Sequence, residues 1–214
     1  MPFRSAPQAP QQAMPGLYAI KPWYTRRLRR IVDLAVARRI SPDVFTTAGL
    51  AAAAVGAVGI AQGWWLLALL GLAGRLAGAN LDGAVARARG VGRPWGFVLN
   101  EVGDRLADLI MFGGLGWLAA DAAGAGSVEV VLVVAAAAAA GLPTFAALAA
   151  AGAGAGRRNG GPLGKTERCA LAVVAAGWPA ALPAICGMVI AGSTLTAALR
   201  LRDAHRELTA GASA

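Results

Sequence analysis

The chain has 214 residues, of which 57% are hydrophobic and only 14% are charged, and its formal net charge is +9. The apolar residues come in long blocks, which favours a protein embedded in a membrane. The positive charge does not indicate nucleic-acid binding, because the basic residues are spread over several segments beside these blocks instead of forming one stripe. Anionic lipid headgroups are the simpler partner.

The first 40 residues precede the first apolar block. Residues 1–16 are polar, rich in Pro and Gln and without the apolar core of a signal peptide, so we expect a disordered tail. Residues 17–40 place apolar side chains at roughly helical spacing against a face of arginines, which predicts an amphipathic helix along the cytoplasmic membrane surface. A short helix docked on the bundle is the alternative. Pro42 then interrupts this helix, and Ser41 or Asp43 can cap the next one.

Six apolar blocks follow within residues 41–202. Because a helix needs about 20 apolar residues to cross a bilayer, we predict an all-α integral membrane fold with six transmembrane helices. Close packing of Gly and Ala is expected to hold the bundle together. The last two blocks share one run broken by Pro179 and Pro183, which a single kinked helix would also explain, and residues 203–214 are expected to form a cytoplasmic tail. The predicted spans are 44–63, 64–85, 97–120, 128–151, 169–185 and 186–199.

Basic residues predict the orientation of these spans. Lys and Arg precede the first span, follow the second and the fourth, and end the chain, whereas the other connections contain none. The positive-inside rule then places both termini in the cytoplasm, which requires an even number of spans. Six spans satisfy this condition.

Acidic and amide side chains gather where the second predicted span ends and the third begins. An ionised group at membrane depth costs at least about 2.5–3.5 kcal/mol unless it is paired, hydrated or metal-bound. Asn100, Asp104 and Asp108 recur every four residues, so they share one face of a helix, and Asp82 can face them across the hairpin. Hard oxygen ligands that converge from two helices suit Mg²⁺ or Mn²⁺.

Two other interpretations of this cluster stay open. Asp82 and Asp108 could instead form ion pairs that pin the helices together, with Arg75, Arg87 or Arg105 as partners. An unrelated transporter could use Asp82 and Asp104 in an ion pathway. A transporter would more often show broken helices at the midplane in paired halves, whereas these acids lie near one surface.

The same stretch resembles the signature of the CDP-alcohol phosphotransferases, Asp-Gly-x2-Ala-Arg-x8-Gly-x3-(Asp/Asn)-x3-Asp, with matching spacing throughout. Residues 41–49 resemble the segment that opens the first span of this family, and residues 161–168 resemble the basic loop before its fifth span. With six spans and cytoplasmic termini, the resemblance covers nearly the whole chain. The residues that match the signature are Asp82, Gly83, Ala86, Arg87, Gly96, Asn100 and Asp104.

The resemblance implies a reaction and a set of roles. The hydroxyl of an acceptor alcohol attacks the β-phosphorus of a CDP-linked donor, commonly CDP-diacylglycerol, and CMP leaves, while two divalent ions held by four Asp neutralise the pyrophosphate. Asp104 would be the general base, and Mg²⁺ or Mn²⁺ the cofactor. Arg87 would face a phosphate or cap its helix. The implied metal ligands are Asp82, Asn100, Asp104 and Asn80, the CDP ligands are Asp43, Thr46, Gly83, Arg87 and Gly96, and the acceptor ligands are Lys165 and Arg168.

Two of the four signature acids are replaced in this chain. The first is Ala79, beside Asn80, and the third is Asn100, beside Glu101. An amide oxygen can ligate a hard cation but brings no charge to offset a second one. The stretch 99–104 also resembles a less common bacterial branch that carries Asn at the first and third positions. The sequence leaves open whether the site holds one metal ion or two.

We therefore predict an enzyme of phospholipid biosynthesis in the bacterial inner membrane, which transfers a phosphatidyl or similar group from a CDP-linked lipid to an alcohol and releases CMP. Its expected partners are CDP-diacylglycerol or a related CDP-alcohol, an alcohol acceptor, membrane lipid and, optionally, a second copy of the chain. The alternative is a non-catalytic relative that binds nucleotide or lipid, or a partner subunit. Retention of Asp104 favours the enzyme, and the replacement of two carboxylates favours the alternative.

Overall fold

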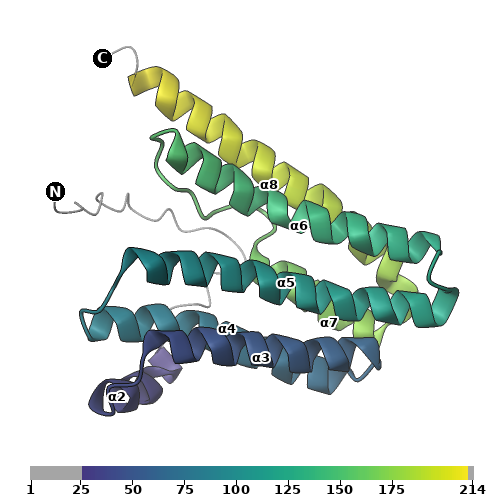
Figure 1. Ribbon diagram of the computed structural model, residues 1–214. Helices are drawn as coiled ribbons and strands as arrows, with labels where there is room; N and C mark the ends of the chain where they lie inside the picture. The colour runs from purple at the N-terminus through teal and green to yellow at the C-terminus, as the bar shows by residue number, and fades with distance from the viewer. Residues whose placement is uncertain (1–25, 212–214) are drawn as a thin grey trace.

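The computed structural model describes residues 26–211, and within this range the chain is built from helices without a β-strand. Figure 1 shows the long helices running roughly side by side, with α2 at one end of α3 and α4. The all-α prediction is confirmed for these residues. The helices are α2 (Arg29–Ala37), α3 (Pro42–Ala61), α4 (Trp65–Ala88), α5 (Pro94–Ala123), α6 (Val128–Gly152), α7 (Lys165–Gly177), the 3₁₀ helix η2 (Pro179–Ala181) and α8 (Leu182–Gly211).

Four helical segments of this range are long and apolar enough to cross a bilayer: α3, α5, α6 and the segment Pro179–Ala210, which joins η2 to α8. The apolar run of α4 is interrupted by Arg75 and Asp82, and α7 has only 13 residues, about 20 Å of helix. The described part of the chain is thus all-α, with the long apolar helices of a membrane protein. Helix length and composition support four of the six predicted spans.

A helix lies within the C-terminal part of the segment predicted to be an amphipathic helix. α2 covers Arg29–Ala37, whereas residues 1–25, which include the expected tail and the start of the helix, lie outside the described range. Ala35 is buried where α2 packs near α4, while Ile31 and Leu34 are 43% and 48% exposed. The N-cap of α3 is Ser41, as predicted. Its Oγ accepts a hydrogen bond from the Asp43 N–H at 3.4 Å.

The C-terminal apolar run forms two helices, not one kinked helix. They separate at Trp178, before Pro179, because proline disfavours helical geometry in the residue that precedes it. The predicted boundary between residues 185 and 186 is therefore wrong by several residues, since Pro183 lies in the first turn of α8, where proline is tolerated. α8 continues to Gly211, so most of the expected tail is helical.

Glycine allows the closest helix contact in the bundle, between α3 and α4. A Cβ on Gly71 would lie 2.3 Å from the Cα of Gly56, and one on Gly78 would lie 2.6 Å from the Cα of Gly49. Such close backbone approach is the means of association expected where lipid provides little hydrophobic drive. It fixes the part of α4 that carries Asp82 against the start of α3.

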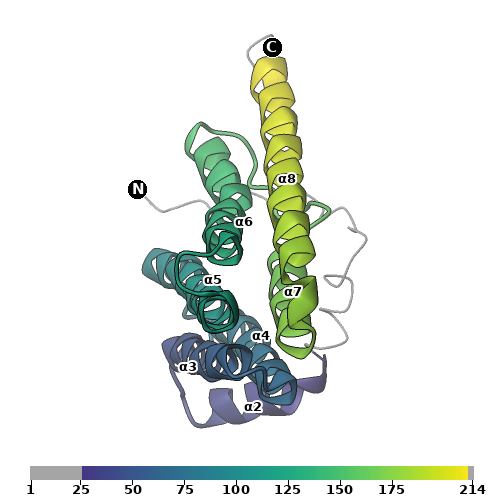
Figure 2. The same cartoon turned by 90° about the vertical axis from the view of Figure 1, so that its right-hand side faces the viewer.

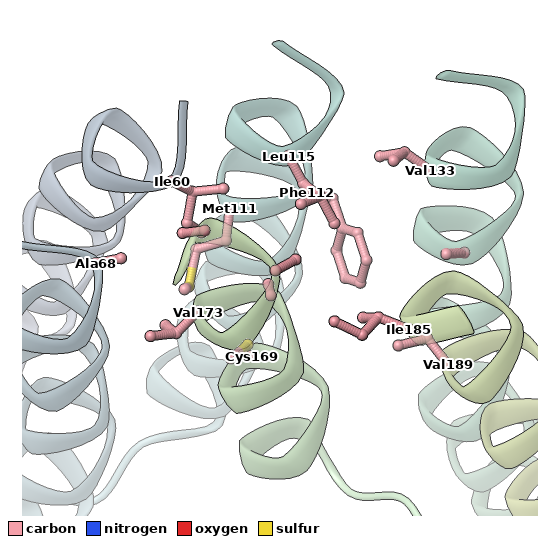
Figure 3. Close-up of a cluster of buried hydrophobic side chains, with 14 of the residues drawn as sticks. Ile60, Ala68, Met111, Phe112, Leu115, Val133, Cys169, Val173, Ile185 and Val189 are labelled. Carbon is pink, nitrogen blue, oxygen red and sulfur yellow. The ribbon is translucent and has the colours of Figure 1, made fainter. Parts of the chain in front are cut away.

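The remaining helices close around an apolar core. Figure 2 looks nearly along the bundle and shows α5 and α7 between the α3–α4 pair and the α6–α8 pair. Figure 3 shows the buried side chains that meet there, among them Met111, Phe112, Cys169 and Ile185. This core lies on the side of the acidic residues toward the α3–α4 connection and holds α4, α5 and α7 in register.

Candidate active site

The structure brings Asp82, Asn100 and Asp104 together at a small cavity of about 20 Å³ between α3, α4 and α5. Ala79, the residue at the first signature position, also lines it. A cavity needs about 10–15 Å³ to hold one water molecule, so this one accommodates a single species of that size. The other lining residues are Thr46, Gly49, Leu50, Arg75, Gly103 and Ala107.

Asp82 is oriented by neutral donors. Thr46 Oγ1 donates a hydrogen bond to Asp82 Oδ2 at 3.0 Å, and the Gly83 N–H donates to Oδ1 at 2.5 Å. Asp82 is only 6% exposed, and within residues 26–211 no Lys or Arg forms an ion pair with it. The alternative in which an arginine partner uses Asp82 to pin the helices is therefore wrong. Its carboxylate charge is left available to a ligand.

Asp104 has a charged partner. Lys165 Nζ, from the first residue of α7, lies 2.5 Å from Asp104 Oδ2. Arg75 donates to the backbone carbonyl oxygen of Asp104 at 3.3 Å. The residue expected to be the general base thus lies directly beside one of the two residues expected to bind the acceptor.

Asp108 lies one turn further along α5 and is only 3% exposed. It does not line the cavity, although Arg75 contacts both it and the Asp104 carbonyl oxygen. It forms ion pairs with Arg75, with Arg105 at 2.9 Å and with Arg168 at 3.5 Å. For this acid the helix-pinning alternative is confirmed.

Arg168 differs from its expected role at the acceptor. It is 2% exposed, and it pairs with Asp108 and donates to the Leu163 carbonyl oxygen at 3.2 Å. The structure therefore places it behind the site, where it fixes the start of α7, and not on a surface that an acceptor can reach.

Asn80 is not brought to the cavity either. Its side-chain nitrogen donates to the Leu76 carbonyl oxygen, one turn back in α4, at 2.8 Å. Glu101 does not replace Asn100, because it pairs with Arg157 at 2.5 Å. Across the described range no group of three or more His, Cys, Asp or Glu is placed to hold a metal ion. Neither Asn80 nor Glu101 therefore replaces a missing signature acid at the cavity.

A larger groove of about 590 Å³ adjoins the cavity and shares Thr46, Asp82 and Asn100 with it. Every residue expected to bind CDP lines this groove: Asp43, Thr46, Gly83, Arg87 and Gly96.

The groove also contains arginines that the sequence analysis assigned only to membrane topology: Arg39, Arg89 and Arg93. Arg93 pairs with Asp43 across the groove, and Arg89 donates to the Ile40 carbonyl oxygen at 2.6 Å. Their position beside the signature was the signal that could have identified them. A basic groove of this size suits a phosphorylated ligand.

Comparison with known proteins agrees with this geometry, although no family model matches the chain. A phosphatidylinositol phosphate synthase of Mycolicibacterium smegmatis is 38% identical over 100 residues, which are 45% of this chain and 44% of the relative. The same enzyme of Mycobacteroides abscessus is 38% identical over 89 residues, 37% of each chain. The chain therefore spans less than half the length of the curated relatives it matches.

Solved structures match over a longer range. The phosphatidylinositol phosphate synthase of Mycobacterium tuberculosis with CDP-DAG bound has a TM-score of 0.64 and 26% identity, over 87% of this chain and 94% of that chain. Its complex with manganese and citrate has a TM-score of 0.67, over 82% and 87%. The chain thus resembles phosphatidylinositol phosphate synthases in part of its sequence and, over most of its length, in its fold. Its replaced acids, Ala79 and Asn100, set it apart from the signature with four Asp.

Proposed function

We propose that the chain transfers a phosphatidyl group from CDP-diacylglycerol, or from a similar CDP-linked lipid, to an alcohol acceptor and releases CMP. The observation that carries this proposal is the continuity of the basic groove with the acid cavity, which share Thr46, Asp82 and Asn100. A nucleotide in the groove would lay its pyrophosphate beside the carboxylates, where charge develops during the reaction. The relatives named above are phosphatidylinositol phosphate synthases, one of them solved with CDP-DAG.

The groove would bind the donor through charge and close contact. Arg87 and Arg93 can donate to phosphate oxygens, once Arg93 leaves Asp43. Gly83 and Gly96 carry no Cβ, so the nucleotide can approach the backbone there. Thr46 and the Gly83 N–H fix the orientation of Asp82 at the inner end of the groove.

Asp104 is the proposed base. As the acceptor hydroxyl oxygen forms a bond to the β-phosphorus, Asp104 takes the hydroxyl proton. The bond between that phosphorus and the oxygen bridging to CMP breaks, and CMP leaves with the electron pair. Lys165, 2.5 Å from Asp104, keeps positive charge at the place where the phosphoryl oxygens would lie.

The residues of the cavity fit a divalent cation. Two carboxylates and one amide oxygen, from Asp82, Asp104 and Asn100, line a space of about 20 Å³, and Mg²⁺ typically takes one or two carboxylates with water and substrate phosphates. Bound Mg²⁺ or Mn²⁺ would offset the negative charge of the pyrophosphate. A solved relative contains manganese. Asn80 is not part of this ligand set.

We infer a phosphorylated acceptor such as inositol phosphate. The names of the relatives point to this class. Lys165 and Arg157 provide cationic groups near the site, Lys165 beside Asp104 and Arg157 beside Glu101, in the segment before α7 and at its start. Arg157 also lies over the ring of Phe97, 4.8 Å from its centroid, which orients its guanidinium.

For the membrane arrangement, we propose that α4 and α7 also cross the bilayer, giving six spans with both termini in the cytoplasm of a bacterium and α2 along the inner surface. The exposed Trp64 directly precedes α4, which ends near Arg87, and α7 begins at Lys165 and is directly followed by the exposed Trp178. Tryptophans gather at membrane interfaces, and Lys and Arg on the cytoplasmic side. Both helices thus have the polarity expected of spans.

A direct assay tests the proposed function. Purified protein in detergent would be incubated with CDP-diacylglycerol, Mn²⁺ or Mg²⁺ and a panel of alcohols that includes inositol phosphate, glycerol phosphate and free inositol. We expect acceptor-dependent release of CMP, with a phosphorylated alcohol preferred. Absence of CMP with every acceptor would favour a non-catalytic relative that binds nucleotide or lipid.

A further inference from the structure

We propose that the ammonium group of Lys165 takes the place of a second divalent cation, so that the acid site of this chain holds one metal ion. The proposal deepens the function proposed above, because it concerns the charge at the same site. It depends on three observations: the number of carboxylates, the size of the cavity and the position of Lys165.

The number of carboxylates balances one ion. The signature that this chain resembles has four Asp, whose four negative charges offset two divalent cations. Here Ala79 and Asn100 stand at two of those positions, and the cavity retains only Asp82 and Asp104 as charged ligands. Two negative charges offset one divalent cation, and the amide of Asn100 adds an oxygen without charge.

The small cavity itself has space for one ion, and the groove that adjoins it is open to the substrate phosphates. Two-metal sites hold their ions roughly 3.5–4 Å apart. The cavity among Asp82, Asn100 and Asp104 measures about 20 Å³, which is little more than one water molecule needs. The methyl group of Ala79 stands where a carboxylate would hold the second ion.

The ammonium group of Lys165 supplies positive charge beside the cavity, on the carboxylate of Asp104. Its Nζ lies 2.5 Å from Asp104 Oδ2, whereas Asp82 receives its hydrogen bonds within residues 26–211 from the neutral donors Thr46 and Gly83. The two carboxylates therefore divide between two cations: Asp82 keeps its charge for the metal, and Asp104 shares its charge with the lysine. An ammonium is a compact charge with three donors, so Lys165 can contact Asp104 and a substrate phosphate oxygen together.

The surrounding structure holds Lys165 in this position. It is the first residue of α7, and Arg168, one turn later, is anchored to Asp108 and to the Leu163 carbonyl oxygen. The Leu163 N–H in turn donates to Thr196 Oγ1 of α8 at 3.2 Å. The start of α7 is thus tied to α5 and α8, which directs Lys165 toward the cavity.

Counting bound Mn²⁺ tests the proposal without reference to activity. The signal of free Mn²⁺ in electron paramagnetic resonance would be titrated with the purified full chain, with Lys165→Met and with Arg158→Met as a matched control. Arg158 lies in the loop that precedes α7 and pairs with Glu207. We expect one Mn²⁺ per wild-type chain, about tenfold or tighter binding in Lys165→Met because the neighbouring positive charge is gone, and wild-type affinity in the control.

A further variant tests the converse. In Ala79→Asp/Asn100→Asp/Lys165→Met, which restores four carboxylates and removes the lysine, we expect two Mn²⁺ per chain. Two Mn²⁺ per wild-type chain, no Mn²⁺ bound up to millimolar concentration, or an unchanged affinity in Lys165→Met would each overturn the proposal. The Lys165→Met titration decides the matter even if the triple variant does not fold. Failure of CMP release with one Mn²⁺ still bound would refute the proposed function and leave this inference standing.

Discussion

Asp104 and Asp108 lie one turn apart on α5, yet their surroundings differ in kind. Asp104 faces a cavity that joins the basic groove, and its one ion-pair partner within the described residues is Lys165. Asp108 is 3% exposed and is surrounded by three arginines from α4, α5 and α7. The first environment leaves the carboxylate accessible to ligands. The second engages the carboxylate in ion pairs that hold helices together. Spacing in the sequence therefore does not by itself assign a role to an acid.

The arginines around Asp108 compensate the cost of burying its carboxylate inside the helix bundle. A buried charge is costly unless it is paired, and removing one partner of a buried pair leaves the other without compensation. Because Arg75 and Arg168 come from α4 and α7, their contacts with Asp108 join three helices below the site. The same contacts set the rotation of α5 that turns Asp104 toward Asp82.

The sharpest test of this contrast is Asp104→Asn. We expect CMP release to fall by about 10²–10⁴-fold, because the amide cannot accept the proton of the acceptor, while the protein stays folded. The measurement is the initial rate of CMP release, with size-exclusion elution as the check on folding. Turnover close to the wild-type rate would remove Asp104 from the role of base.

Asp108→Asn should show the opposite pattern. Loss of this carboxylate leaves the guanidinium groups of Arg75, Arg105 and Arg168 without their shared partner, and we expect the free energy of unfolding to drop by about 3–5 kcal/mol. Denaturation in a mixed detergent series, compared with Asp104→Asn, would measure it. Equal free energies of unfolding for Asp108→Asn and Asp104→Asn would contradict the structural role of Asp108.

Restoring the third signature acid tests whether residue 100 faces a metal ion in the cavity. Asn100 lines the cavity together with Asp82 and Asp104, so Asn100→Asp adds a third negative charge there. We therefore expect Mn²⁺ to bind about tenfold more tightly. Isothermal titration with Mn²⁺ checks this, with Glu101→Gln as the control, because Glu101 pairs with Arg157. An affinity equal to that of the wild type would show that residue 100 does not face the metal.

Asp43→Asn should have the smallest effect. The ion pair between Asp43 and Arg93 is half exposed, and such pairs contribute about 0–1 kcal/mol, so stability should change little. We expect the KM for CDP-diacylglycerol to change by a few-fold with kcat preserved, since the change lies in the groove and not at the reacting atoms. A large loss of kcat would indicate that Asp43 acts in the chemical step.

Much of the site could be predicted because it depends on local spacing. The separation of Asn100 and Asp104 by four residues keeps them on one side of a helix, and the hairpin between α4 and α5 brings Asp82 to face them. By Asp108, eight residues from Asn100, an ideal helix has turned by about 80°, and the side chain meets α7 instead of the cavity. This drift separates Asp108 from the cavity that Asn100 and Asp104 line.

The amino-acid sequence by itself determined the helical membrane architecture, the acid pair Asp82 and Asp104, and the two vacant signature positions, because apolar block length, charge placement and residue spacing are local properties of the chain. Only the tertiary structure decided which cations meet which acids. Lys165 and Arg168 lie three residues apart in one loop motif, yet one contacts Asp104 at the cavity and the other is buried on Asp108. Their separate roles depend on the rotation of α7 against α5, which packing among distant segments sets and no local pattern encodes.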